Sequence, residues 1–534
     1  MVHDPADDSQ LAGTTGAVRD ITGVQDPAGR PVDPATGLTG TEAELTGEAD
    51  AVVAALPRLP TGVAGLDHLL RGGLVADRTT LVVGTSGSGK TLLCSQILHN
   101  NAVLRDGPAV LVSFEEPAED VIRNVQTLGF GFDRLIAAGK LEVIDASPAP
   151  QALAPSGAFD LSGIILQVRS AVEDTGAKLV VLDSLGGLFT QFGDVGMLRR
   201  ELVRLRNTLR EMGCTAVMTA ERAHEYGQVS RHGVEDFVAD CVVILRHQLS
   251  DERVRRTVQV YKIRGDRHRE GGCPVTIIPG EGLVALPLSA AELSQESADE
   301  RVPFGNEDLD AMTGGGLFRD SIVLISGPTG GGKTLLCTTF AAHGCSHGDR
   351  VLFLGYEESR PQLGRNARNW GYDFAKWEAD GLLQVSCEYP ENRLLEGHLL
   401  EIRRQIDRFR PTRLVIDSIT ALERVGTPRT FREFLIGLSS FLKRERICAC
   451  LTSTGPHTVS HGEQVGVNVS TLTDAIFLLR YVEREEELGR ALTVIKMRGS
   501  QHDKRVRAFT IDDAGLHLGD AVSAASGLAA AIPG

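Results

Sequence analysis

Short, uninterrupted apolar runs recur in the same order in the two halves of the chain. In the first half they read LVVG, AVLVSF and KLVVLDS, and in the second half IVLISG, VLFLGY and RLVIDS. Runs of this kind, without alternating polar residues, are typical of strands buried in a parallel sheet. The stretch from Arg199 differs, because Leu202, Leu205, Leu209 and Met212 recur at helical spacing, which predicts the core-facing side of a helix over 199–212.

This repeat sets the expected domain organisation. At 534 residues the chain is too long for a single core. One long-period repeat predicts two domains of about 240 residues each. We place the domains at residues 51–285 and 301–520, with a polar linker at 286–300. Residues 1–50 are rich in Asp, Gly, Thr, Pro and Ala, which predicts a disordered acidic extension, and residues 521–534 form a short flexible tail.

A glycine-rich phosphate-loop motif follows the first of these strands in each half. The motifs read GTSGSGKT and GPTGGGKT, and an apolar helical stretch comes directly after each. Backbone N–H groups of the loop and the helix N-terminus would therefore face phosphate oxygens. Lys90 and Lys333 would reach the terminal phosphates, and Thr91 and Thr334 would offer hydroxyls to Mg²⁺. The predicted loop residues are Gly84, Thr85, Ser86, Gly87, Ser88, Gly89, Lys90 and Thr91 in the first half and Gly327, Pro328, Thr329, Gly330, Gly331, Gly332, Lys333 and Thr334 in the second.

Pairs of glutamates follow the second strand of each half. Glu115 and Glu116 come after AVLVSF, and Glu357 and Glu358 come after VLFLGY. A carboxylate at the carboxyl end of a parallel strand, beside a phosphate loop, can orient or deprotonate a nucleophile that attacks the γ-phosphate. The alternative is a pair of solvated loop acids. Recurrence of the pair in both halves favours the catalytic interpretation.

The third strand of each half ends in an aspartate, Asp183 or Asp417. In phosphate-loop enzymes an aspartate at this point holds the other side of the Mg²⁺ that the loop threonine binds. Many parallel strands end in Asp, so the pattern gains its weight from the phosphate loop that lies upstream at a similar distance in both halves.

A pair of cations closes each half. YKIRG places Lys262 and Arg264, and IKMRG places Lys496 and Arg498, at alternate positions of a predicted strand and hence on one face. Because each phosphate loop already has its own lysine, we expect these pairs to face the γ-phosphate of a neighbouring subunit. A cation supplied across an interface raises the rate by about 10³ to 10⁵ in known GTPases. A solvated edge strand is the alternative.

Composition narrows the class of protein further. The net charge of −15 argues against a broad basic surface for nucleic acid, although not against a local one. The nine cysteines have no CxxC spacing and mostly sit in apolar runs, as reduced core residues of a cytoplasmic protein do. We see no signal peptide and no apolar run of eighteen residues, so we expect neither export nor a membrane span.

The longer stretches around these motifs resemble the KaiC family, the double-domain RecA-like ATPases of the cyanobacterial clock. The resemblance covers about residues 57–518 and rests on SFEEP, MTAERAHEYG, GVEDFVADCVVILR, GYEESRPQLGRNARNWG, VSTLTDAIFLLRYVE and IKMRGSQHDK. It implies an α/β fold of two tandem RecA-like P-loop NTPase domains, each with a parallel-sheet core flanked by helices. It also implies a two-tiered homo-hexamer that binds ATP and Mg²⁺ between subunits, with slow ATPase activity in the first domain and serine/threonine autokinase and autophosphatase activity in the second.

The resemblance assigns roles to individual residues. Neighbour-supplied nucleotide contacts would come from Lys262, Arg264 and His268 in the first domain and from Arg490, Lys496 and Arg498 in the second. Trp370 would lie near the second-domain nucleotide, and Glu357 would take the hydroxyl proton of a phosphoacceptor. Ser470 and Thr471 fall at the adjacent phosphoacceptors of the family.

Comparison of the two halves supports the phosphoacceptor assignment independently. When DFVADCVVIL is aligned with STLTDAIFLL, Asp236 and Phe237 stand opposite Ser470 and Thr471. Only the second half can therefore accept phosphate at this point. The alternative is an ordinary strand start, since Thr favours strands.

The sequence departs from the family pattern at three points. Val465 stands where the family has a third threonine, Asp266 and Arg267 replace a small hydroxyl pair after YKIRG, and little sequence follows IDDAGLHLG.

Together these features predict an ATP-driven phospho-switch whose state a signalling or clock-type partner reads. One alternative is a RecA-like nucleic-acid-dependent ATPase or recombinase, but the candidate loops FTQFGDVGMLRR and ERVGTPRTFR hold few arginines. The other alternative is an assembly platform in which ATP only joins subunits. The two glutamate pairs and the two cation pairs argue against it.

Overall fold

The computed structural model describes residues 56–147, 161–189, 194–233, 235–250, 253–287, 298–454, 469–484, 487–512 and 515–521. The predicted N-terminal extension, most of the predicted linker, nearly all of the predicted tail and Val465 lie outside these ranges. Among the helices in these ranges, none combines the length and the apolar character that a membrane crossing requires.

Within the described residues, the first domain is built on a nine-stranded sheet with the order β11-β10-β9-β8-β3-β7-β6-β4-β5. Strands β5, β4, β6, β7, β3 and β8 pair in parallel, and β9, β10 and β11 continue the sheet in antiparallel fashion. The strands are β3 (Thr79–Gly84), β4 (Ala109–Ser113), β5 (Leu141–Asp145), β6 (Leu179–Asp183), β7 (Thr215–Glu221), β8 (Cys241–Ser250), β9 (Arg253–Ile263), β10 (Cys273–Ile278) and β11 (Gly282–Ala285). The helices are α2 (Leu66–Leu69), α3 (Lys90–Arg105), α4 (Ala118–Gln126), α5 (Phe132–Ala137), α6 (Ser162–Thr175), α7 (Gly186–Phe189), α8 (Val195–Glu211) and α9 (Glu235–Val238).

The second domain repeats this arrangement strand for strand, in the order β16-β15-β17-β18-β14-β19-β20-β21-β22 over the described residues. Its strands are β14 (Ile322–Ser326), β15 (Val351–Gly355), β16 (Leu383–Cys387), β17 (Arg413–Asp417), β18 (Cys448–Ser453), β19 (Ala475–Arg484), β20 (Glu487–Met497), β21 (Arg507–Asp512) and β22 (Gly515–Ala521). Its helices are α10 (Glu307–Met312), α11 (Lys333–Ser346), α12 (Arg360–Asn369), α13 (Phe374–Ala379), the 3₁₀ helix η2 (Pro390–Asn392), α14 (Leu395–Phe409), α15 (Ile419–Glu423), α16 (Pro428–Arg444) and α17 (Val469–Leu472). A small two-stranded sheet precedes each large one: β1 (Arg58–Leu59) with β2 (Leu74–Val75), and β12 (Arg301–Val302) with β13 (Leu317–Phe318). The predicted tandem α/β fold is confirmed.

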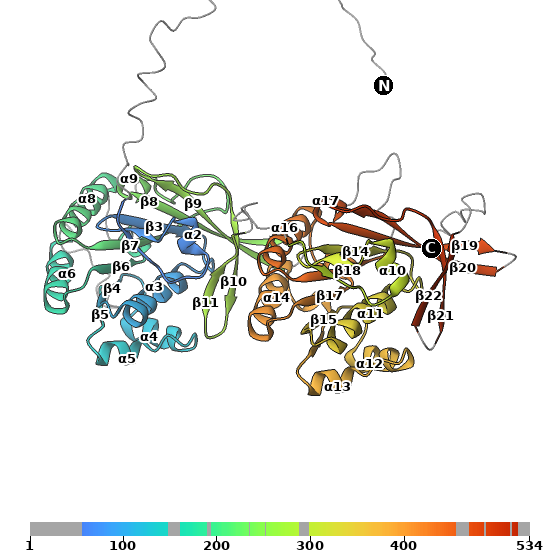
Figure 1. Ribbon diagram of the computed structural model, residues 1–534. Coiled ribbons are helices and arrows are strands. Elements are labelled where there is room, and N and C mark those ends of the chain that lie inside the picture. Colours follow the sequence, from blue (N-terminus) through green and yellow to red (C-terminus); the bar gives the residue numbers. More distant parts are fainter. Residues whose placement is uncertain are drawn as a thin grey trace, which may run out of the picture. The chain divides into compact units, whose positions relative to one another are not determined.

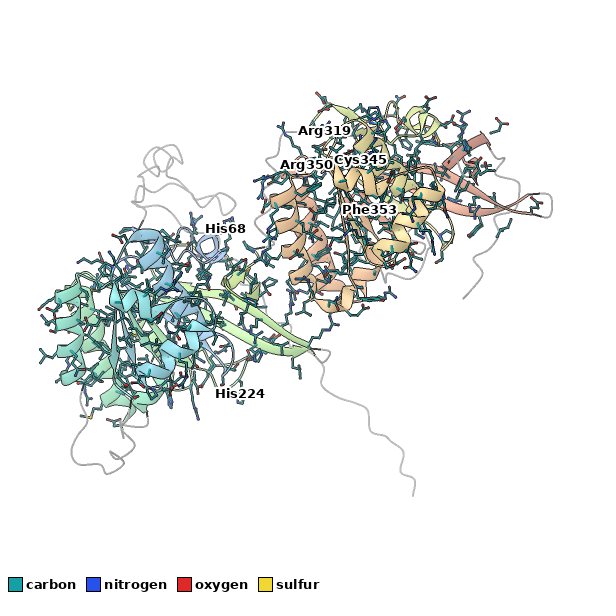
Figure 2. All side chains as sticks on the ribbon, turned by 90° about the horizontal axis from the view of Figure 1, so that it is seen from below. His68, His224, Arg319, Cys345, Arg350 and Phe353 are labelled. Carbon is teal, nitrogen blue, oxygen red and sulfur yellow. The ribbon has the colours of Figure 1, made fainter. Side chains whose placement is uncertain are left out.

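Helices cover both faces of each parallel sheet (Figure 1). In strand β14, Val323 and Ile325 belong to the core cluster that includes α11, whereas Ile322 and Leu324 belong to the cluster formed with α14 and α16. Phe353, labelled in Figure 2, is buried in the first of these clusters. Since successive strand residues point to opposite faces, burial on both faces requires the uninterrupted apolar runs seen in the sequence.

Two predicted elements have different limits in the structure. The helix predicted from Arg199 begins earlier, at Val195, where the Asp194 side chain accepts a hydrogen bond from the Gly196 N–H and caps the N-terminus. The segment that holds Ser470 and Thr471 is the short helix α17, and β19 begins only at Ala475. The interpretation of these two hydroxyl residues as a strand start is therefore wrong.

The second-domain core contains a buried arginine whose removal should be costly. The Arg413 side chain is 2% exposed, and its Nε donates to Asp349 Oδ2 at 2.7 Å. Its Nη1 donates to the carbonyl oxygens of Pro303 and Phe340. Burial would raise the pKa of Asp349, but Arg413 lowers it below its usual value. The buried guanidinium thus neutralises a partly buried carboxylate and binds two backbone carbonyl groups.

We therefore expect Arg413→Met to destabilise the second domain by about 3 kcal/mol, because one partner of a buried ion pair is lost. Both tryptophans, Trp370 and Trp377, lie in this domain, so urea unfolding followed by tryptophan fluorescence measures it directly. Arg350→Met is the control, because Arg350 is exposed and only its guanidinium, stacked on Phe409, is lost. Arg350→Met should lower the free energy of unfolding by at most about 1 kcal/mol. Equal losses in the two variants would contradict the role of Arg413.

Candidate active sites

The two phosphate loops connect β3 to α3 and β14 to α11. In the first loop Gly87 and Gly89 have φ angles of 73° and 99°, and in the second Gly330 and Gly332 have φ angles of 74° and 97°. These left-handed conformations favour glycine, which explains why the motif spaces its glycines as it does. Each helix begins at the lysine of the motif, so its free N–H groups open toward the loop.

The loop lysines fold back over their own loops. Lys90 Nζ donates to the carbonyl oxygens of Gly84 and Thr85, both at 3.1 Å. Lys333 Nζ donates to the carbonyl oxygens of Gly327 and Pro328, at 2.9 and 3.0 Å. Burial lowers the pKa of Lys333. Each ammonium therefore lies at the mouth of a loop that could enclose phosphate groups.

A hydroxyl and a carboxylate meet beside the second loop. Thr334 Oγ1 donates to Asp417 Oδ2 at 2.7 Å, and Thr452 Oγ1 donates to Asp417 Oδ1. Burial raises the pKa of Asp417. A cation bound nearby would have the opposite effect and favour the ionised carboxylate. In the first domain, Asp183 accepts a hydrogen bond from Thr219. The threonine–aspartate pair in the second domain fits the Mg²⁺ donor set of phosphate-loop enzymes.

The described residues contain no group of three or more His, Cys, Asp or Glu side chains that could hold a metal by themselves.

The first glutamate of each pair is bound by the serine that follows the strand-end aspartate. Ser184 Oγ donates to Glu115 Oε1 at 3.1 Å, and Ser418 Oγ donates to Glu357 Oε1 at 2.5 Å. Each serine directly follows the aspartate at the end of its strand. Glu115 and Glu357 are therefore held close to the strand-end aspartates, Asp183 and Asp417.

The environment of Glu115 suits a general base. Burial raises its pKa, and the negative charges of Glu221 and Asp183 add to the shift. A Cβ atom at Gly186 would lie 2.4 Å from Glu115 Oε1, so a larger residue there would displace the carboxylate. A glutamate with a raised pKa binds a proton more strongly, which improves it as a base near neutral pH.

The second glutamate of each pair turns toward a helix. Asn124 of α4 donates to Glu116 Oε2 at 3.3 Å, and Asn366 of α12 donates to Glu358 Oε2 at 2.9 Å. Burial raises the pKa of Glu358. The structure thus distinguishes two glutamates that the sequence could only treat as a pair.

The cation pairs hold short helices. Lys262 Nζ donates to the Asp236 carbonyl oxygen at 2.7 Å, and Arg264 Nη2 donates to the Phe237 carbonyl oxygen at 3.0 Å. Strand β9 ends at Ile263, so Arg264 lies just beyond it, and both cations bind adjacent carbonyl groups of α9. That they face the γ-phosphate of a neighbouring subunit stays a prediction.

The second domain has the matching arrangement. Lys496 Nζ donates to the Thr473 carbonyl oxygen at 2.6 Å, and Arg498 Nη2 donates to the Thr471 carbonyl oxygen at 2.7 Å. Thr471 is exposed, and Ser470 precedes it in α17. The structure therefore brings the predicted phosphoacceptors and the predicted cation pair to one place.

Arg490 lies elsewhere. Its Nε donates to the Gly330 carbonyl oxygen at 3.2 Å, and Tyr481, its partner across β19 and β20, donates to the Thr329 carbonyl oxygen at 3.0 Å. Strand β19 is the neighbour of β14, which leads into the loop. Its register with β20 therefore brings Arg490 to the phosphate loop of its own chain. Its contact with the nucleotide of a neighbouring subunit stays a prediction.

Three further positions singled out by the sequence lie apart from these contacts. His268 is half-buried in the segment after β9. Trp370 caps the C-terminus of α12 and packs against the second-domain core. Asp266, which departs from the family pattern, forms ion pairs with Arg58 and Arg71.

The sequence patterns did not predict several residues that contact the predicted site residues. They are the two serines that bind the inward glutamates, the two threonines that bind the strand-end aspartates and the two asparagines that bind the outward glutamates: Ser184, Ser418, Thr219, Thr452, Asn124 and Asn366. All six form three matched pairs between the halves. A position-by-position comparison of the repeats is the signal that could have found them.

Comparison with known proteins agrees with this geometry. The family model described as "ATPase: KaiC" matches residues 59–290 and 302–522. A relative named "Circadian clock protein KaiC3", from Synechocystis, is 46% identical over 479 residues, which are 90% of this chain and 95% of that protein. "Circadian clock oscillator protein KaiC" from Parathermosynechococcus lividus is 44% identical over 470 residues, or 87% of this chain and 86% of that protein. With two family domains and relatives this similar over nearly their whole length, the chain belongs to the KaiC family of ATPases.

Proposed function

We propose that this protein is a KaiC-like phospho-switch: a ring of six subunits that hydrolyses ATP in its first domain and phosphorylates and dephosphorylates itself in its second. The observation that carries this proposal is the place of α17. Arg498 binds the backbone of the phosphoacceptor helix and Lys496 binds the Thr473 carbonyl oxygen just after it, so a phosphate that these cations attract would lie beside Ser470 and Thr471.

In the first domain the nucleophile is water. Lys90 and the loop N–H groups bind the phosphates, and Thr91 and Asp183 would hold Mg²⁺, which neutralises charge that develops on the phosphate oxygens. Glu115, held by Ser184, accepts a proton from the attacking water. Lys262 and Arg264 of the adjacent subunit complete the site.

In the second domain the nucleophile is a Ser470 or Thr471 hydroxyl of the adjacent subunit. Its oxygen forms a bond to the γ-phosphorus while the bond between that phosphorus and the ADP oxygen breaks, and Glu357 takes the hydroxyl proton. Thr334 and Asp417, already in contact, would hold Mg²⁺. Trp370 and His268 are proposed nucleotide contacts on the strength of the family resemblance.

The relatives' names refer to circadian clocks, so we propose clock-type or signalling proteins as the partners that read the phosphorylation state. All nine cysteines are free thiols in the structure, which fits the reducing cytosol that we propose as the location.

Assembly tests this proposal directly. Because each nucleotide needs cations from two subunits, we expect ATP with Mg²⁺ to convert the protein into hexamers, as measured by light scattering at micromolar concentration. The variant Lys90→Ala/Lys333→Ala should stay smaller under the same conditions. A wild-type protein that remains monomeric with ATP and Mg²⁺ would argue strongly against the ring. Phosphate release that depends on added single-stranded DNA would instead favour a nucleic-acid-dependent ATPase.

A further inference from the structure

Glu225, which lies in the stretch MTAERAHEYG but has no role assigned above, holds the first-domain phosphate loop. Thr85 Oγ1 donates a hydrogen bond to Glu225 Oε1, and the His247 backbone N–H donates to Glu225 Oε2 at 3.1 Å. Glu225 belongs to the segment Arg222–Arg231 that follows β7, whereas His247 belongs to β8. One carboxylate therefore joins the phosphate loop to two other parts of the domain.

The position of Glu225 is itself fixed by a buried arginine. Arg222 is 5% exposed, and its guanidinium donates to the carbonyl oxygens of Glu225, Gly227 and Gln228 at 2.9 to 3.3 Å. Its backbone N–H donates to the Gly84 carbonyl oxygen at 3.1 Å, at the start of the phosphate loop. Because the guanidinium is planar and rigid, these bonds fix the backbone that carries Glu225.

Displacement of Thr85 would reach the phosphate-binding groups. The Thr85 carbonyl oxygen accepts a hydrogen bond from Lys90 Nζ, the ammonium that would contact the terminal phosphates. Gly87 and Gly89 follow in left-handed conformations. Because glycine is conformationally permissive, ordering this loop around a ligand costs more backbone entropy than ordering other residues would. An anchor on Thr85 reduces that loss in advance.

In the second domain, different interactions hold the corresponding part of the phosphate loop. Pro328 stands where the first loop has Thr85, and proline fixes its own φ angle. Hydrogen bonds from Tyr481 and Arg490 then hold the carbonyl oxygens of Thr329 and Gly330. Among the described residues, a carboxylate that binds the side chain of the second loop residue is thus found in the first site and not in the second.

We propose that Glu225 is a positioning residue for ATP in the first domain, which acts by holding Thr85 and hence the phosphate loop in its binding conformation. This inference rests on the proposed function only in that the first domain binds ATP. Because Glu225 acts through Thr85 and not on the reacting atoms, its loss should weaken ATP binding and leave turnover at saturating ATP nearly unchanged.

The test uses the full chain with Lys333→Ala, so that nucleotide binding and hydrolysis report the first domain. In this parent, Glu225→Ala and Thr85→Val should each raise the Kd for a fluorescent ATP analogue, and the KM for ATP, about tenfold, as loss of a charge-assisted hydrogen bond predicts. The kcat should stay within about twofold. Glu225→Gln keeps one oxygen acceptor, enough for Thr85 but not for the His247 N–H as well, so its affinity should lie between those of the parent and of Glu225→Ala.

Two comparisons identify the mechanism. The double variant Glu225→Ala/Thr85→Val should bind no more weakly than either single variant, because both remove the same hydrogen bond. His224→Ala is the matched control, since His224 is exposed and adjacent to Glu225, and it should bind as the parent does (Figure 2).

The proposal is overturned if Glu225→Ala binds the analogue with parental affinity, even when its melting temperature falls. Multiplicative losses in the double variant would overturn it as well, since Glu225 would then not act through Thr85. A parent that binds the analogue but releases no phosphate would contradict the proposed ATPase activity, while the binding measurements would still test Glu225.

Discussion

Phosphate labelling of Ser470 and Thr471 should disappear in Lys333→Ala and return when this variant is mixed with Ser470→Ala/Thr471→Ala. Lys333 folds over the second phosphate loop, so its loss removes the ammonium that would hold the terminal phosphates. The phosphoacceptor helix and the residue Thr473 that follows it closely are bound instead by Arg498 and Lys496, the cations that we assign to the ATP of an adjacent subunit. Neither variant should incorporate label from radioactive ATP by itself, because one lacks the donor and the other the acceptors.

Mixed rings combine an intact donor site with intact acceptors, so we expect labelling at Ser470 and Thr471 of the Lys333→Ala chains only. Mass spectrometry after separation of differently tagged chains would locate the label. Subunit exchange must be measured in parallel by fluorescence transfer between labelled chains. If rings exchange subunits and remain unlabelled, transfer between subunits is excluded. Absence of label in the wild type would remove the kinase assignment altogether.

Glu115→Gln should lower the rate of ATP hydrolysis in the first domain by about 10² to 10⁴, the usual contribution of a positioned general base. Glu115 is the inward glutamate, bound by Ser184 and with a pKa raised by burial. The amide is almost isosteric and keeps a hydrogen-bond acceptor for Ser184, but it cannot take a proton from water. Phosphate release should be measured in a background that carries Glu357→Gln and Glu358→Gln, so that hydrolysis in the second domain does not mask the effect.

Glu116→Gln in the same background is the control. Its carboxylate accepts a hydrogen bond from Asn124 and turns toward α4, and an amide can keep that contact through its oxygen. We therefore expect the rate of ATP hydrolysis to change by less than about threefold, because the substitution preserves the hydrogen bond from Asn124. If instead Glu116→Gln stops hydrolysis while Glu115→Gln does not, the two glutamates have the opposite roles.

The sequence alone was sufficient for the architecture. Uninterrupted apolar runs identified the buried parallel strands, because strands covered on both faces cannot alternate. The phosphate loops could be recognised because all the residues of the motif lie within eight consecutive positions. The internal repeat then showed which strand-end acids were worth attention, since they recur at corresponding places in both halves.

Only the tertiary structure decided how these residues are used. The choice between Glu115 and Glu116 depends on Ser184, which lies 69 residues away along the chain. Thr85 meets Glu225 across 140 residues, and Arg490 reaches Gly330 across 160, through the register of β20 with β19. Local patterns describe which groups a segment can offer. The direction in which a side chain points at the end of a strand, and the partner that it finds there, are set by strand order and by packing between distant segments, which no local pattern encodes.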